Sequence, residues 1–185
     1  VKAGGTWKLS RAVKDIDLAF VVDGPVPVKI NGVKVTEQSV AVLPGSYAFT
    51  TGLRYIGFGS KNVVLVRSPY VDADTYDIQS QLTKSGKKAA IAAAEKSYNK
   101  CLKVHSLTPK NCPQKFNSKY TYNKSTITWR RTGKDPFRKP SVTFSGTQAR
   151  VQVPIDLKLS GSCSYQGRSG NCSGSLTGSA ASQGR

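Results

Sequence analysis

Apolar residues recur at every second position in the first third of the chain, in short runs separated by turn signals. Residues 26–30 alternate up to the Asn31-Gly32 pair, and Val33 and Val35 resume the alternation beyond it. This pattern around Asn-Gly is typical of a β-hairpin. Further runs at 17–22, 40–43, 46–49 and 62–67 predict more strands and no helix. We therefore expect residues 1–68 to form a small β-sandwich.

The pattern changes after Ser68-Pro69, which we take as a domain boundary. An Ala-rich stretch over 87–102 has high helix propensity, and Thr83 or Ser85 can cap it. Its apolar residues recur at helical spacing, which predicts one buried stripe facing a sheet. The stripe consists of Ile91, Ala94, Tyr98 and Cys101.

The sheet is predicted by apolar positions that return to period 2 after the helix, most regularly over 151–159. The second domain, 69–174, is thus expected to hold one long helix packed on a curved antiparallel sheet. Residues 175–185 are small and polar, and we expect them to form a flexible Gly/Ser tail. The predicted fold class is α+β.

The four cysteines allow three pairings. Ten residues separate Cys101 from Cys112 and eight separate Cys163 from Cys172, and each interval contains turn-forming residues. Neither spacing matches the C-x-x-C of zinc or redox sites. We predict the two local disulfides, Cys101 with Cys112 and Cys163 with Cys172, in an oxidising compartment; the alternative is four reduced thiols in a cytosolic protein.

The single histidine, His105, leaves histidine-dependent triads and multi-histidine metal sites without enough bases or ligands. Ser85-Gly86-Lys87-Lys88 matches the S-x-x-K motif of penicillin-binding enzymes, but the S-D-N element is missing. We expect no enzyme activity, no catalytic residue, no metal site and no cofactor.

Positive charge is concentrated in the second part of the chain. The net charge is +18; up to Leu82 nine Lys and Arg face seven Asp and Glu, and from Thr83 onward nineteen face three. Such a field attracts polyanions, although the lysines could also serve only a solvated surface. The candidate polyanion-binding residues cluster at the helix start and in one later loop: Lys84, Lys87, Lys88, Arg130, Arg131, Lys134, Arg138 and Lys139.

Aromatic residues interleave with this charge at Tyr120, Tyr122, Trp129 and Phe137. A basic surface with stacking aromatics is typical of single-stranded nucleic-acid binding. Their alternation also suits core strands, which we favour. Nucleic-acid binding is kept as the alternative function.

Two stretches resemble envelope proteins of Gram-positive bacteria, especially actinobacteria. Val-Lys-Ile-Asn-Gly-Val-Lys-Val at 28–35, followed by Val-Leu-Pro-Gly-Ser-Tyr-Ala-Phe at 42–49, is similar to the TcaA-like family, as is Cys101 followed by Leu-Thr-Pro-Lys-Asn-Cys-Pro at 107–113. The resemblance implies a noncatalytic, membrane-anchored extracellular module whose second domain is a cone of the nuclear transport factor two-like type.

From the resemblance and the charge together we expect a location on the outer face of the cell membrane, held by an N-terminal span that this chain lacks. The expected partner is an anionic wall polymer or an anionic lipid surface, with another envelope protein as a further partner.

Overall fold

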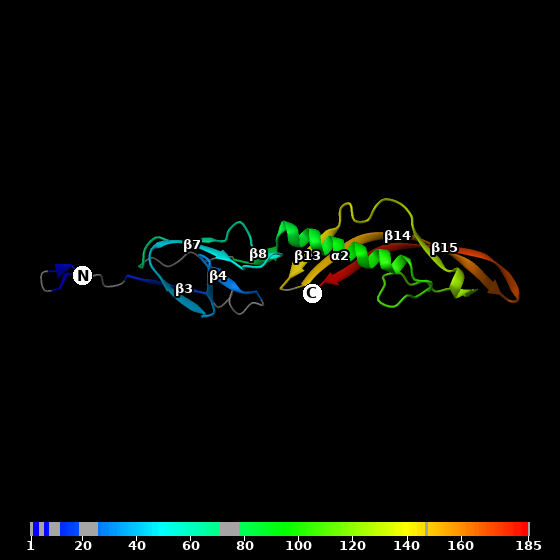
Figure 1. Ribbon diagram of the computed structural model, residues 1–185, viewed down its shortest axis with the longest axis horizontal. Coiled ribbons are helices and arrows are strands. Elements are labelled where there is room, and N and C mark those ends of the chain that lie inside the picture. Colours follow the sequence, from blue (N-terminus) through cyan, green and yellow to red (C-terminus); the bar gives the residue numbers. More distant parts are fainter. Residues whose placement is uncertain are drawn as a thin grey trace. The chain divides into compact units, whose positions relative to one another are not determined.

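The computed structural model describes residues 2–3, 6–7, 12–18, 26–70, 78–146 and 148–184, and the chain divides into two compact units (Figure 1). Unit 1 comprises Val1–Gly86 with Ser145–Thr147, and unit 2 comprises Lys87–Phe144 with Gln148–Arg185. The division falls later than the boundary expected at residue 68. The reason is that strand β10 (Ser80–Leu82) pairs antiparallel with β8 (Ile56–Phe58), which ties the chain up to the helix start to unit 1.

Unit 1 is built from short antiparallel strands. A four-stranded sheet has the order β5-β4-β7-β9, and three further pairs are β1-β2, β3-β6 and β10-β8. The remaining bounds are β1 Lys2–Ala3, β2 Thr6–Trp7, β3 Lys14–Asp17, β4 Val28–Ile30, β5 Val33–Val35, β6 Ser39–Val42, β7 Gly45–Thr50 and β9 Val63–Val66.

The predicted hairpin is confirmed. Strands β4 and β5 pair across Asn31 and Gly32, whose φ angles of 46° and 87° are the positive values that a type I′ turn requires. Phe49 and Ile16 are fully buried in a core shared by the four-stranded sheet and the β3-β6 pair. The strand expected over 17–22 begins earlier, in β3, and its residues 19–22 lie outside the described part of the chain.

The predicted helix is present as α2, Lys84–Leu102. The Thr83 hydroxyl accepts a hydrogen bond of 3.0 Å from the Gly86 amide, so Thr83 provides the N-cap. Ala94, Tyr98 and Cys101 are buried on one stripe, as their spacing predicts. Among the helices that the structure describes, none has the length and hydropathy of a membrane span.

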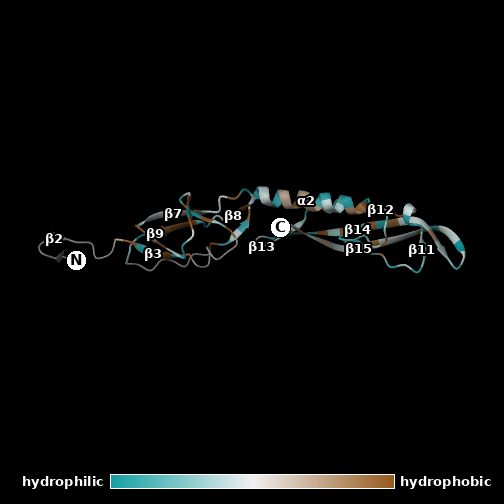
Figure 2. Cartoon of the chain, turned by 60° about the horizontal axis from the view of Figure 1, so that its bottom comes forward, coloured by the Kyte–Doolittle hydropathy of each residue, from teal (hydrophilic) through white to brown (hydrophobic). Residues whose placement is uncertain are grey.

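In unit 2, α2 lies along a five-stranded antiparallel sheet that is organised around the long strand β14 (Figure 1). β11, β12, β13 and β15 all pair with it. Along β14 the odd-numbered residues 151–159 are buried, the even-numbered residues 152–158 are exposed and Ser160 is half-buried. Figure 2 shows β14 and the rest of the chain coloured by hydropathy. The bounds are β11 Thr121–Tyr122, η1 Lys124–Thr126, β12 Thr128–Arg131, β13 Ser141–Ser145, β14 Gln148–Tyr165 and β15 Arg168–Gly184.

The flexible tail predicted over 175–185 is wrong for the described residues 175–184, which form the second half of β15 and pair with β14. Gly and Ala, which recur along this segment, have low β-propensity, and this concealed the strand. Leu176 and Ala180 nevertheless face the core, and a Cβ at Gly174 would collide with the Phe116 ring. Packing against β14 and Phe116 therefore explains why small residues are used here.

Candidate anion-binding surface

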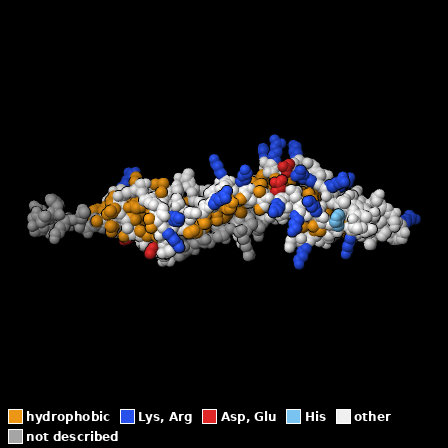
Figure 3. Space-filling view, in the orientation of Figure 1, with side chains coloured by type: hydrophobic (Ala, Val, Ile, Leu, Met, Phe, Trp, Pro, Cys, Tyr) orange, Lys and Arg blue, Asp and Glu red, His pale blue; other side chains and the backbone are white. Residues whose placement is uncertain are grey.

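All eight predicted cationic residues are exposed, and they come from three segments of the chain. The first turns of α2 carry three of them, β12 carries two, and the loop 132–140 between β12 and β13 carries the remaining three. Lys84 is grouped with unit 1 and the other seven with unit 2. In Figure 3, Lys and Arg side chains gather over unit 2, with few acidic side chains among them.

Arg130 and Arg131 are neighbours in the sequence and were predicted as one cluster, but they lie on opposite faces of β12. Because side chains alternate along a strand, Arg131 shares the face of the buried Trp129, while Arg130 lies on the opposite face. We call that opposite face, which carries Arg130 and the exposed even-numbered residues of β14, the open face.

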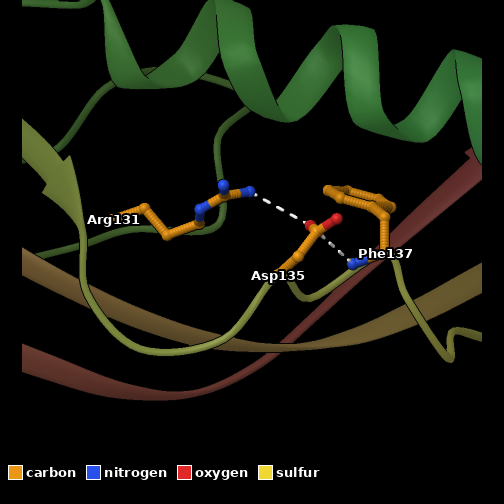
Figure 4. A network of polar contacts seen from close by, with 3 residues as sticks. All are labelled: Arg131, Asp135 and Phe137. Atoms are coloured by element: carbon orange, nitrogen blue, oxygen red, sulfur yellow. Dashed lines mark hydrogen bonds and ion pairs between the residues drawn. The ribbon is translucent and has the colours of Figure 1, made fainter.

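Arg131 forms an ion pair with Asp135. Its guanidinium donates to Asp135 Oδ1 over 3.1 Å, and the same oxygen accepts from the Phe137 amide over 3.2 Å (Figure 4). Asp135 thus orders the turn that carries Lys134 and Arg138. Arg131 contributes less free charge to the surface than the sequence suggested, because Asp135 neutralises part of its charge.

On the open face, Arg130 lies directly opposite Lys158 in the register of β12 and β14. Side chains in such cross-strand positions have Cβ atoms about 4.5–5.5 Å apart, and like charges there repel. Within the described residues neither side chain takes part in an ion pair. Sequence reasoning missed Lys158, because its only signal was a polar position in an alternating strand.

Both predicted disulfides are present. Cys101 is bonded to Cys112 with a Cα–Cα distance of 5.6 Å, and Cys163 to Cys172 with 5.8 Å, both within the usual range. The first ties the end of α2 to the following loop. The second joins β14 to β15 near their connecting turn.

The loop after α2 is also anchored by hydrogen bonds to and from its backbone and side chains. Trp129 Nε1 donates to the Ser106 carbonyl over 2.8 Å, and His105 Nδ1 donates to the Ile127 carbonyl over 2.5 Å. Gln114, which is fully buried, donates from Nε2 to the Cys101 carbonyl over 2.9 Å. These contacts give His105 and Gln114 structural roles.

The aromatic residues divide between core and surface. Trp129 is 4% exposed and is closed to bases, and Tyr122 and Phe137 are partly buried against the same core. Tyr120 is exposed and forms an edge-to-face pair with Tyr165, with Lys119 lying over both rings. Of the four aromatic residues predicted as a stacking platform, Tyr120 alone is exposed.

A cavity of about 400 Å³ lies between α2 and the sheet, lined by Tyr98, Phe137, Val151 and others. The Tyr98 hydroxyl is buried and has no hydrogen-bond partner among the described residues. Burial raises the pKa of this phenol, Arg131 acts in the opposite direction, and Asp156 and Asp135 raise it further. Among the described residues that line the cavity, Tyr98 has no second titratable side chain beside it, because both lining cysteines are disulfide-bonded.

Within the described ranges, the structure shows no group of three or more His, Cys, Asp and Glu side chains that could hold a metal ion. Comparison with protein-family models, with curated protein sequences and with solved structures found no match to this chain.

Proposed function

We propose that this chain is a noncatalytic extracellular module of a bacterial envelope protein, and that its basic unit 2 binds an anionic, phosphate-bearing polymer of the cell wall. The charge distribution carries the proposal. Unit 2 contains eighteen Lys and Arg but three Asp and Glu, whereas unit 1 contains ten and seven. A surface with so few internal counter-charges gains free energy by recruiting external anions.

The two disulfides support a location outside the cytoplasm, since disulfides persist in oxidising compartments. A wall polymer is a polyanion found in that compartment. We also propose that a preceding membrane span anchors the chain and that the chain lies on the outer face of the cell membrane.

A polymer suits unit 2 better than a lipid surface does. Peripheral binding to membranes combines charge with apolar side chains that enter the interface. The exposed large apolar side chains described in unit 2 are few, namely Val104, Tyr120 and Tyr165. Binding to lipid headgroups is therefore the alternative that the binding test must separate from binding to the polymer.

The finer architecture is part of the proposal as well. We propose that unit 1 is a small β-sandwich, on the support of its shared core, and that unit 2 is a cone of the nuclear transport factor two-like type, on the support of its helix and curved sheet. The TcaA-like relationship has the support of the sequence resemblance alone.

The test compares two charge-matched variants of the full chain. Lys134→Gln/Lys139→Gln removes two exposed charges from unit 2, and Lys34→Gln/Lys61→Gln removes two exposed charges from unit 1. Titration with poly(glycerol phosphate) should show weaker binding for the first variant and unchanged binding for the second. Equal losses in both variants, or no binding by the parent chain, would overturn the proposal.

Two further probes separate the alternatives. Vesicles of phosphatidylglycerol and phosphatidylcholine test the lipid surface, and a single-stranded oligonucleotide with the same number of phosphates tests nucleic acid. Under the proposal, the polymer binds more tightly than either probe. A preference for the oligonucleotide that is lost in Tyr120→Ala would favour base stacking and contradict the proposal.

A further inference from the structure

The open face of unit 2 carries a shallow depression of about 570 Å³ at the end where β14 and β15 join. Arg130 and Lys158 are among the residues that line it. The remaining lining includes Ser160, Ser162, Asn171 and Ser173, and no aromatic residue. The depression thus combines two cations with hydroxyl and amide groups.

The strand register explains how these residues come together. Arg130 is paired with Lys158, Ser160 with Ser173, and Ser162 with Asn171. Because Lys158, Ser160 and Ser162 are two residues apart along β14, they share one face, with steps of about 6.6 Å. A pair of cations is therefore followed by two cross-strand pairs of neutral polar side chains.

The depression is held in place by covalent and hydrogen bonds. The Cys163–Cys172 disulfide joins the two strands beside the polar pairs, and Thr126 Oγ1 accepts from the Ser162 amide over 2.8 Å. The hydroxyls of Thr128 and Ser160 lie 2.7 Å apart. These bonds fix the strands beneath the depression, so the entropy cost of binding falls mainly on the long side chains of Arg130 and Lys158.

The two cations lack a partner within the described part of the protein. Arg130 and Lys158 face each other without an ion pair there, and Asp156, the nearest acid on this face of β14, lies outside the depression. Two like charges side by side, next to a polar hollow, can be neutralised by one bound anion. Phosphate oxygens match both a guanidinium and an ammonium group.

We infer that this depression is a binding site for one phosphodiester unit of a polyol-phosphate chain. Arg130 and Lys158 contact the phosphate oxygens, and the side chains of Ser160, Ser173 and Asn171 hydrogen-bond the polyol hydroxyls. The inference rests on the proposed function and names this depression as the place where unit 2 recognises the polymer. No aromatic side chain lines the depression itself, which favours a polyol over a nucleotide as its occupant.

The experiment compares the full-length variant Arg130→Gln/Lys158→Gln with Lys134→Gln/Lys139→Gln, which loses the same charge from the same unit. Titration with poly(glycerol phosphate) should show about a tenfold or larger loss of affinity for the first variant, since hydrogen bonds to charged groups are lost. The second variant should lose less than about fivefold, as expected for exposed charges acting at a distance.

A second measurement locates the site directly. In an NMR titration with sn-glycerol 3-phosphate, the backbone amides of Arg130, Lys158, Ser160 and Asn171 should shift, and those around Lys87 should not. In addition, Asn171→Ala should weaken binding of poly(glycerol phosphate) more than binding of inorganic polyphosphate, which has no hydroxyl-bearing carbon chain.

The outcomes separate this inference from the proposed function. If the parent chain binds none of the phosphate polymers, both fail. If it binds poly(glycerol phosphate) but the two double variants lose affinity equally, the site is wrong and general charge attraction through unit 2 stands. Amide shifts confined to the start of α2 would also overturn the site.

Discussion

Arg130 and Lys158 stand directly opposite each other on β12 and β14, on the exposed face of the sheet. Their strands are hydrogen-bonded neighbours within one sheet, so the register holds the Cβ atoms of the two cationic side chains about 4.5–5.5 Å apart. Directly opposed like charges destabilise a strand pair. Such a loss of folding stability is expected where side chains serve binding rather than folding.

The first prediction concerns this cost. Lys158→Thr should raise the free energy of unfolding by about 0.5 kcal/mol at low salt, because it removes the repulsion and suits a strand. The gain should shrink at high salt, where the charges are screened. Urea unfolding at two salt concentrations measures it, with Lys134→Thr in the loop as the control. A loss of stability in Lys158→Thr at low salt would contradict the repulsion.

The second prediction concerns Trp129, which is buried and donates to the Ser106 carbonyl. Trp129→Ala should lower the free energy of unfolding by about 3–5 kcal/mol, as expected when a large buried aromatic side chain is removed. Tyr120→Ala, at an exposed position, should cost about 1 kcal/mol or less. Chemical unfolding followed by circular dichroism compares the two. Similar costs for both variants would show that Trp129 is not the core residue described.

The third prediction concerns the disulfides. Each closes a short loop, with sequence separations of 11 and 9, so loss of either pair by Cys→Ser should cost about 2.5–3 kcal/mol in the chain-entropy model. Peptide mapping without reduction should recover Cys101 linked to Cys112 and Cys163 linked to Cys172. Free thiols in protein purified without reductant would remove the support for an oxidising compartment.

The fourth prediction follows from the raised pKa of Tyr98. Burial keeps the phenol neutral in the folded state, while in the unfolded chain it ionises near pH 10.0. The contribution of this group to stability is therefore complete below pH 10 and is lost as the pH rises from there through the folded-state pKa.

Tyr98→Phe provides the comparison. Because the hydroxyl has no partner among the described residues, the variant should be as stable as the parent at pH 7, or about 1 kcal/mol more stable. Above pH 10 it should lose less stability than the parent. Thermal unfolding between pH 7 and 11 tests both points, and parallel losses in the two proteins would show that Tyr98 does not cause the dependence.

Much of the fold follows from local pattern. The Asn31-Gly32 turn, the capped helix with its buried stripe and the alternation over 151–159 each depend on residues close together in the sequence, and each is present. Strand β15 was missed because its Gly, Ser and Thr residues show no strong alternation. They become a strand through pairing with β14, which is a tertiary effect.

The candidate surface was predictable in composition but not in arrangement. The exposure of the eight cations follows from their charge, yet the sequence could not show that Arg130 and Arg131 lie on opposite faces of β12. Lys158 is 28 residues beyond Arg130 in the chain, and its position opposite Arg130 depends on the register between β12 and β14. A local sequence pattern does not show which residues of two distant strands lie opposite each other.

The central claim is that unit 2 binds a phosphate polymer through its exposed cations. The most direct measurement is the dissociation constant of the full chain for poly(glycerol phosphate) as salt is raised from about 50 to 200 mM. Because each cation–phosphate contact releases counterions, affinity should fall about tenfold or more over this range if several contacts form. Absence of binding at the low salt concentration, or an affinity that does not change with salt, would contradict the claim.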